Sequence, residues 1–210
     1  MKKLILSQDI DTKLFEYLML ISPSEEVSRK VSEVKSIFSE TYGCKHAAQL
    51  VPHLTMINFL QQESAEFRLI NCFEKFTQYV APFSIELNGF GEFAPHTIYL
   101  KLAETQPVID LVKDLRSKFQ RILKISEQLK PNYTLKPHLT IARQLTPEQF
   151  ETIWPTYKKE HFSESFLAKE MILIRREVDP FTRKSTGKYK IVHHFPFLGK
   201  QREAQLAMAF

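Results

Sequence analysis

The sequence contains little glycine and little cysteine, and this scarcity argues against several kinds of site. Five of the 210 residues are glycine, and no G-x-G-x-x-G or Walker phosphate loop occurs. The two cysteines, Cys44 and Cys72, lack the spacing of a metal site. We therefore expect no disulfide framework and no glycine-rich nucleotide loop, and a reducing cytoplasm fits the chain best.

Long apolar runs are missing as well. The apolar residues 4–6 end at Ser7, which is too short a run for a signal peptide. No stretch approaches the roughly 20 apolar residues that a membrane span needs. The net charge of +5 and the pI near 9.1 give a mild preference for an anionic partner. We expect a cytoplasmic monomer with no membrane segment.

Apolar periodicity predicts a mixture of helices and strands. At 210 residues the chain can bury a core, as one domain with two closely packed lobes. Helical spacing and short alternating runs separate the two kinds of element. Helices are expected over residues 23–41, 66–79, 107–125 and 147–157, and strands over 15–21, 53–59, 83–87, 97–102, 138–142, 166–177 and 188–197.

Two local signals set expected boundaries. Ser22 is the expected cap of the first helix, because Pro23 suits the first helical position and Glu25 completes a capping box. Residues 88–91, Asn-Gly-Phe-Gly, are expected to form the turn of a hairpin between strands 83–87 and 97–102.

The order of elements repeats. Each half contains a helix, a strand that opens with the same tetrapeptide, another helix and a pair of strands. No low-complexity segment separates the halves. The repeat predicts an α+β fold of two similar lobes, with mostly antiparallel sheet, outer helices and a central cleft.

The repeated tetrapeptide, Pro-His-Leu-Thr, is the most informative feature of the chain. It occupies residues 52–55 and 137–140. His and Thr two residues apart on a strand point to the same face. Two such strands side by side would present His53, Thr55, His138 and Thr140 to one cleft.

These residue types suit hydrolysis of a phosphate ester. A base must take a proton from water and an acid must protonate the leaving oxygen. With a reference pKa of about 6.5, one imidazole can be neutral while the other is protonated. The Thr55 and Thr140 hydroxyls can donate to the non-bridging oxygens. The chain shows no carboxylate cluster of the kind a two-metal nuclease needs, so no metal and no cofactor are expected.

Other residues could assist. Arg143 could bind phosphate through two hydrogen bonds, with a surface ion pair as the alternative. Tyr99 could stack on a base or pack in the core, and core packing is favoured for Phe93. A set of basic residues could guide an RNA backbone, although a solvated surface explains such charge more often. The set is Arg175, Arg176, Arg183, Lys184, Lys188 and Lys190.

The chain resembles the 2H phosphoesterase superfamily, in particular its bacterial 2′-5′ RNA ligase or RNA 2′,3′-cyclic phosphodiesterase branch. Residues 53–55 and 138–140 resemble the two H-x-T motifs of that superfamily, and Arg143 resembles an Arg that often follows the second motif. Residues 89–93 resemble its central hairpin, and 187–189 with 194–196 its closing strand pair. The resemblance covers about residues 14–198 of a single domain, 1–210.

The resemblance implies a metal-independent phosphodiesterase. Its expected substrates are 2′,3′-cyclic phosphates of RNA ends or nucleotides, and its product carries a 2′-phosphate. His53 is then the favoured acid and His138 the favoured base, although the near-symmetry of the motifs leaves their order open. The family name also implies RNA 2′-5′ ligation as a secondary reaction.

Three alternatives remain. The same chemistry could hydrolyse 2′,5′-linked oligonucleotides or an ADP-ribose cyclic phosphate. In a different class, the chain could be an RNA- or nucleotide-binding module with little turnover.

Overall fold

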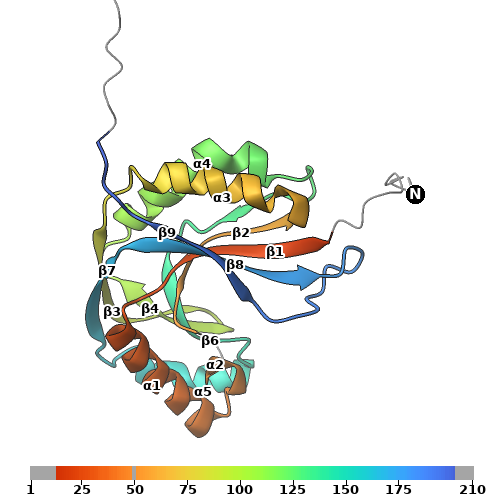
Figure 1. Ribbon diagram of the computed structural model, residues 1–210. Coiled ribbons are helices and arrows are strands. Elements are labelled where there is room, and N and C mark those ends of the chain that lie inside the picture. The colour runs from red at the N-terminus through yellow and green to blue at the C-terminus, as the bar shows by residue number, and fades with distance from the viewer. Residues whose placement is uncertain (1–12, 49–50, 202–210) are drawn as a thin grey trace, which may run out of the picture.

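The computed structural model describes residues 13–48 and 51–201, which form an α+β fold around one antiparallel sheet (Figure 1). The strand order is β7-β3-β4-β6-β2-β1-β8-β9, and β5 pairs with β2. Within the described residues, no helix is both long enough and apolar enough to cross a membrane. The helices are α1 (Glu25–Tyr42), α2 (Lys45–Ala48), the 3-10 helix η1 (Glu63–Ala65), α3 (Glu66–Thr77), α4 (Gln106–Leu123) and α5 (Pro147–Tyr157). The strands are β1 (Leu14–Ile21), β2 (Leu54–Gln62), β3 (Phe83–Phe93), β4 (Thr97–Leu102), β5 (Asn132–Tyr133), β6 (His138–Arg143), β7 (Ser163–Ala168), β8 (Glu170–Val178) and β9 (Lys190–Pro196).

The helices cover the sheet in two groups and so define two lobes (Figure 1). Helices α3 and α4 lie over the lobe of β1, β2, β8 and β9, whereas α1, α2 and α5 lie against the lobe of β3, β4, β6 and β7. One copy of the repeated tetrapeptide runs into β2 and the other into β6. The expected architecture of antiparallel lobes with outer helices is confirmed.

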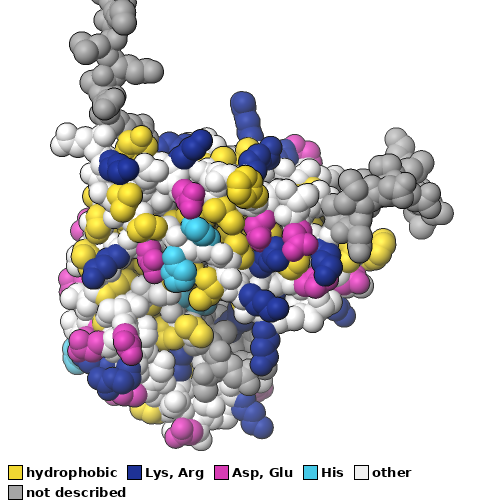
Figure 2. Space-filling view, in the orientation of Figure 1, with side chains coloured by type: hydrophobic (Ala, Val, Ile, Leu, Met, Phe, Trp, Pro, Cys, Tyr) yellow, Lys and Arg dark blue, Asp and Glu magenta, His cyan; other side chains and the backbone are white. Residues whose placement is uncertain are grey.

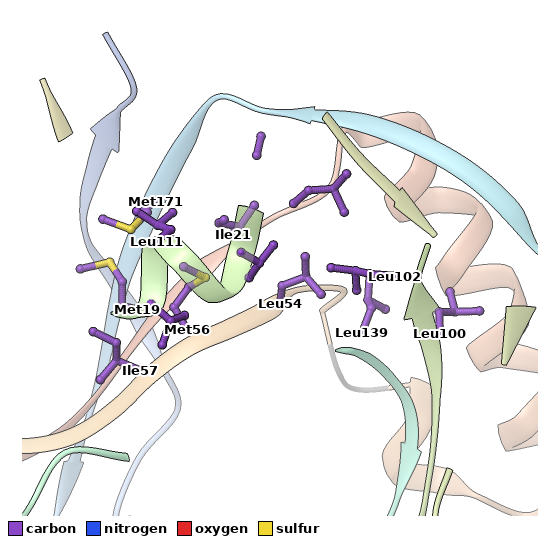
Figure 3. Close-up of a cluster of buried hydrophobic side chains, with 14 of the residues drawn as sticks. Met19, Ile21, Leu54, Met56, Ile57, Leu100, Leu102, Leu111, Leu139 and Met171 are labelled. Carbon is purple, nitrogen blue, oxygen red and sulfur yellow. The ribbon is translucent and has the colours of Figure 1, made fainter. Parts of the chain in front are cut away.

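The lobes join where β2 meets β6. These strands share one register pair, Leu54 with Leu139, and both side chains are fully buried. Figure 3 shows the two leucines side by side, between Met56 in one lobe and Leu100 in the other. The hydrophobic core therefore continues from one lobe into the other.

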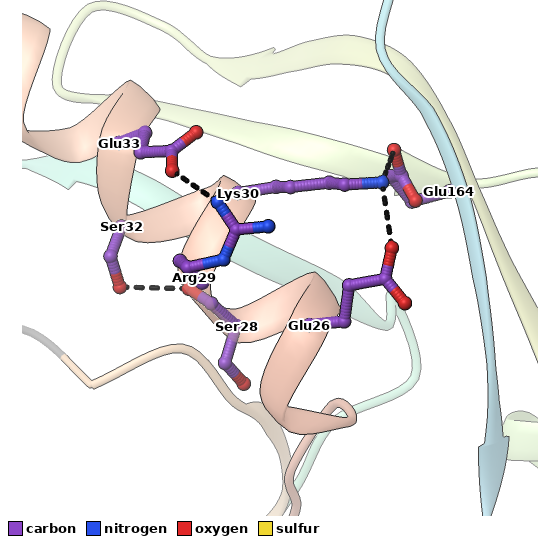
Figure 4. Close-up of polar contacts among 7 residues, drawn as sticks. All are labelled: Glu26, Ser28, Arg29, Lys30, Ser32, Glu33 and Glu164. Atoms are coloured by element: carbon purple, nitrogen blue, oxygen red, sulfur yellow. Dashed lines mark hydrogen bonds and ion pairs between the residues drawn. The ribbon is translucent and has the colours of Figure 1, made fainter.

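Helix α1 is fixed to β7 by Lys30. Its Nζ lies 2.8 Å from Glu164 Oε1 and 3.2 Å from Glu26 Oε1, one helical turn away (Figure 4). Arg29 and Glu33 form a further pair on the exposed side of the helix. Exposed pairs of this kind add little to stability. The main effect of the Lys30–Glu164 pair is therefore on the orientation of α1.

The expected start of the first helix is wrong by two residues. Ser24, not Ser22, caps α1, and its hydroxyl accepts a hydrogen bond from the backbone N–H of Val27 at 3.4 Å. Strand β1 continues to Ile21. Ser22 and Pro23 are therefore needed to lead the chain from the strand into the helix.

The expected turn at residues 88–91 is also wrong. Strand β3 continues through these residues to Phe93. Gly89 adopts φ +67°, and the register with β4 shifts between Leu87 and Phe90. The Asn-Gly pair therefore forms a β-bulge, for which glycine at positive φ is suited. The hairpin turns instead at residues 94–96.

The expected strand over 166–177 is in fact two strands. β7 ends at Ala168 and pairs with β3, whereas β8 begins at Glu170 and pairs with β1. Lys169 is the single residue between them. Ala168 and Met171 are both buried, but in different lobes. An apolar pattern cannot reveal this crossing, because both lobes require the same kind of residue.

We predict that the junction between the lobes is important for stability. Leu139→Ala removes a fully buried side chain and should lower the free energy of unfolding by about 2–5 kcal/mol. The matched variant Leu135→Ala, at a side chain that is 46% exposed, should change it by less than about 0.5 kcal/mol. Urea unfolding measures the free energy of unfolding of both variants. Equal losses would show that the buried junction is no more important for stability than an exposed position.

Candidate active site

The Leu54–Leu139 pair determines where the repeated motifs lie. Because both leucines face the core, their neighbours on each strand face the other side of the sheet. Counted outward from this antiparallel pair, His53 is across from Thr140 and Thr55 is across from His138. These four side chains are half-buried. Both H-x-T motifs thus lie together on one surface of β2 and β6, which we call the site face.

The two histidines make matching hydrogen bonds. Nδ1 of His53 lies 2.7 Å from the carbonyl oxygen of Val51, and Nδ1 of His138 lies 2.7 Å from that of Lys136. A carbonyl oxygen only accepts, so Nδ1 carries the proton in each ring. Among the described residues, no further hydrogen bond occupies either Nε2. Each Nε2 is therefore the atom available for proton transfer.

A bulge follows each H-x-T motif. The register slips at Met56 in β2 and at Ile141 in β6. A bulge inserts one residue and so reverses the alternation of side chains beyond it. The residue three positions after each Thr therefore returns to the site face. That residue is Asn58 in the first motif and Arg143 in the second, which makes these two positions equivalent in the two lobes.

Two aromatic rings flank His138. Its ring centroid lies 4.8 Å from that of Phe93, with the planes at 86°, and 5.1 Å from that of Tyr99. Tyr99 is the register partner of Thr140. A Cβ at Gly91 would lie 2.6 Å from Cε2 of Tyr99, so glycine leaves room for this ring. The expectation that Phe93 packs in the core is wrong, because β3 continues past its bulge and carries Phe93 to His138.

Burial lowers the pKa of both histidines. For His53, the positive charges of Lys35, Arg143 and His138 lower the pKa further. In both rings the hydrogen bond to a backbone carbonyl opposes the shift. A lowered pKa makes each imidazolium a stronger proton donor than a free imidazolium.

Lys35 is a buried cation close to the site that the sequence patterns did not bring out. It lies on the apolar side of α1 with Val31 and Phe38, and it is 2% exposed. Burial and the charge of Arg143 lower the pKa of Lys35 to about 8. A lysine within the apolar stripe of a helix is the signal that could have identified it. Together with Arg143 and His53, it concentrates positive charge where a phosphate would be attracted.

Asn58 also belongs to a polar network centred on Glu16. Glu16 accepts hydrogen bonds from Asn58 Nδ2 at 2.8 Å, Arg176 Nε at 2.5 Å and the Tyr189 hydroxyl at 2.9 Å. The guanidinium of Arg176 also lies 4.6 Å from the centre of the Tyr189 ring. Burial raises the pKa of Glu16, but the three donors outweigh it and the pKa is lowered. The carboxylate therefore fixes Arg176 and Tyr189 beside the first motif.

Only part of the expected basic set is available to a ligand. Arg175 pairs with Glu63 at 2.8 Å and Glu66 at 2.6 Å, and Arg176 belongs to the network of Glu16. The remaining members are exposed and, among the described residues, have no ion pair. They are Arg183, Lys184, Lys188 and Lys190.

The other described histidines form no metal site. His193 pairs with Glu74 at 2.9 Å and His194 with Glu170 at 3.0 Å, and Figure 2 shows histidine beside acidic side chains over β8 and β9. In residues 13–48 and 51–201, no group of three or more His, Cys, Asp or Glu could hold a metal ion. The side chain of His46 lies outside the described part.

Solved structures share this fold. TT0787 of Thermus thermophilus has a TM-score of 0.63 and 19% identity, and the match covers 89% of this chain and all of that one. E. coli LigT complexed with 3′-AMP has a TM-score of 0.57 and 15% identity, with coverage of 89% and 98%. The chain thus shares the fold of TT0787 and LigT.

The family follows from the sequence. The chain belongs to the 2′-5′ RNA ligase superfamily, whose family model matches residues 23–180. A Staphylococcus epidermidis relative, named "Putative phosphoesterase", is 27% identical over 142 residues, which are 65% of this chain and 80% of the relative. Family and relatives together support a phosphodiesterase-type activity.

We predict that Lys35 helps to hold the pKa of His53 down. Lys35→Met keeps the length of the side chain but removes a positive charge that disfavours the imidazolium, so the pKa of His53 should rise. NMR titration of the imidazole measures this pKa. The control, Lys30→Met, alters a lysine of the same helix that pairs with Glu164 and should leave it unchanged. An unchanged pKa in Lys35→Met would contradict the electrostatic link.

Proposed function

We propose that the chain hydrolyses RNA or nucleotide 2′,3′-cyclic phosphates to 2′-phosphates, through its two H-x-T motifs. The observation that carries this proposal is the matched pair of histidines, each with Nδ1 bound to a backbone carbonyl and Nε2 available. A nucleotide substrate agrees with the 3′-AMP complex of E. coli LigT. Because both cysteines are free thiols, we assign the reaction to the cytoplasm.

The reaction needs one proton removed from water and one proton delivered to the leaving oxygen. Nε2 of His138 takes a proton from water, and the water oxygen attacks phosphorus. The bond from phosphorus to the 3′-oxygen breaks, and Nε2 of His53 protonates that oxygen. This order is the one that the resemblance to the family implies. The positive charges around His53 strengthen its imidazolium as a donor, but they also disfavour that protonated form.

The neighbouring groups suit the developing negative charge. Thr55 and Thr140 lie on the site face and can donate to the non-bridging oxygens. Arg143 ends β6 on the same face and can bind phosphate through two hydrogen bonds. Tyr99, beside His138, can support the ribose or base of the substrate. None of these steps requires a metal ion.

We predict that both histidines are essential for turnover. His53→Ala and His138→Ala should each lower kcat by about 10²–10⁴-fold on a short RNA with a 2′,3′-cyclic phosphate, measured in EDTA. The matched control is His194→Ala, an exposed histidine on β9, which should change kcat by less than about twofold. Losses below about tenfold in both test variants would refute the proposed roles.

We also predict an acidic optimum. Burial disfavours both imidazolium forms, so the pair binds its first proton below the ordinary pKa of 6.5. The reaction needs one neutral and one protonated ring, and kcat/KM follows the pKa values of the free enzyme. The profile of kcat/KM should therefore be bell-shaped with its maximum below pH 6.5. A maximum well above that pH would contradict the lowered values.

A panel of substrates separates the alternatives. The protein could turn over 2′,5′-linked oligonucleotides or an ADP-ribose cyclic phosphate but not the RNA cyclic phosphate. That result would show that the two-histidine reaction acts on those bonds instead. Tight binding of RNA with no turnover of any member would favour a binding module.

A further inference from the structure

The connection between β8 and β9 is a well-defined turn built on Asp179. Its Oδ1 accepts hydrogen bonds from the backbone N–H groups of Phe181 at 3.0 Å and Thr182 at 2.6 Å. Its carbonyl oxygen accepts one from the N–H of Arg183 at 2.8 Å, and Arg183 is held at φ +58°. This conformation is uncommon for residues other than glycine. The hydrogen bonds around Asp179 therefore fix how the turn presents its side chains.

This turn presents an aromatic ring beside positive charge. Phe181 is 89% exposed. The turn, residues 179–187, contains two cations, Arg183 and Lys184, and one acid, Asp179, which directs its carboxylate to backbone N–H groups. Figure 2 shows hydrophobic, basic and acidic side chains exposed at the end of the molecule where this connection lies. An exposed ring with nearby cations is the combination that binds single-stranded nucleic acid, by stacking on bases and attracting the backbone.

The base of this hairpin lies next to the site face. Tyr189 is fixed by Glu16, which also binds Asn58. Burial raises the pKa of Tyr189, and the positive charge of Arg143 acts on it in the opposite direction, so Arg143 is nearby. Asp179 follows Arg176 by three positions at the end of β8, about 10 Å at a rise of about 3.3 Å per residue. A chain leaving the site face beside Arg143 could reach the turn within a few nucleotides.

We propose that Phe181, Arg183 and Lys184 bind the single-stranded RNA that precedes the reacting phosphate, so that the preferred substrate is an RNA end rather than a mononucleotide. This inference rests on the proposed function, which it deepens by naming the substrate class. The surface is called the RNA-docking turn.

The test compares a long and a short substrate. Phe181→Ala removes the ring and Lys184→Glu reverses a charge, while Arg183 is left intact because of its backbone conformation. For an RNA octamer ending in a 2′,3′-cyclic phosphate, each variant should lower kcat/KM by about tenfold, through KM. For a nucleoside 2′,3′-cyclic phosphate, kcat/KM should stay within about twofold of the wild type.

Matched controls lie elsewhere on the surface. Phe67→Ala removes a ring that is 77% exposed on α3. Lys190→Glu reverses a charge on the same hairpin, but Lys190 is the register partner of Arg175 and shares the face on which Arg175 binds Glu66. Neither control should change kcat/KM for the octamer by more than about twofold. Equal losses in the controls and the test variants would overturn the proposal.

Direct binding separates this proposal from the proposed function. Fluorescence anisotropy with a 2′-O-methyl RNA octamer needs no turnover, and the variants of the RNA-docking turn should weaken its binding by about tenfold. If the wild type binds the octamer through the turn but turns over neither substrate, only the proposed hydrolysis is refuted. Turnover of both substrates with no effect of the turn variants would refute only the docking. If the variants of the RNA-docking turn lost binding to phosphatidylserine vesicles while their RNA binding stayed unchanged, the turn would be a membrane-binding surface. That result would also overturn the proposal.

Discussion

The backbone pairing of β2 with β6 at Leu54 and Leu139 is the contact on which the site depends. It turns two buried leucines into the shared core of both lobes and, by alternation, turns the neighbouring His and Thr side chains to one surface. Each lobe alone would carry one histidine and one threonine. Antiparallel pairing brings the two motifs onto one surface in a nearly symmetric arrangement.

Positive charge and burial act together on this surface. Burial and the charge of Arg143 lower the pKa of Lys35, and burial together with the charges of Lys35, Arg143 and His138 lowers the pKa of His53. Protonating these groups therefore costs free energy when no anion is bound. A bound phosphate would offset the repulsion between these charges, so the site is well suited to an anion. On the neighbouring strands, Glu16 balances Arg176, so the positive charge of the site face is concentrated around the histidines rather than spread over the sheet.

Periodicity and the repeat predicted the α+β architecture, the repeated order of elements and the hairpin of β3 and β4. They failed where two structures share one local pattern. The Asn-Gly pair at Gly89 suits a turn or a bulge equally, and the apolar run through Lys169 suits one strand or two. Asn58 was missed because an unbroken strand would direct it to the core, and only the bulge at Met56 returns it to the site face. Lys35 was missed because one lysine leaves the apolar periodicity of the helix intact, so the periodicity alone predicts the helix without marking the buried charge.

The most direct test of the central claim is phosphorus NMR of the product that the wild-type protein forms from a short RNA with a 2′,3′-cyclic phosphate in EDTA. If His138 activates water and His53 protonates the 3′-oxygen, the product carries its phosphate on the 2′-oxygen alone. A 3′-phosphate would show that the opposite bond breaks, and an unchanged cyclic phosphate with folded protein would contradict cyclic phosphodiesterase activity.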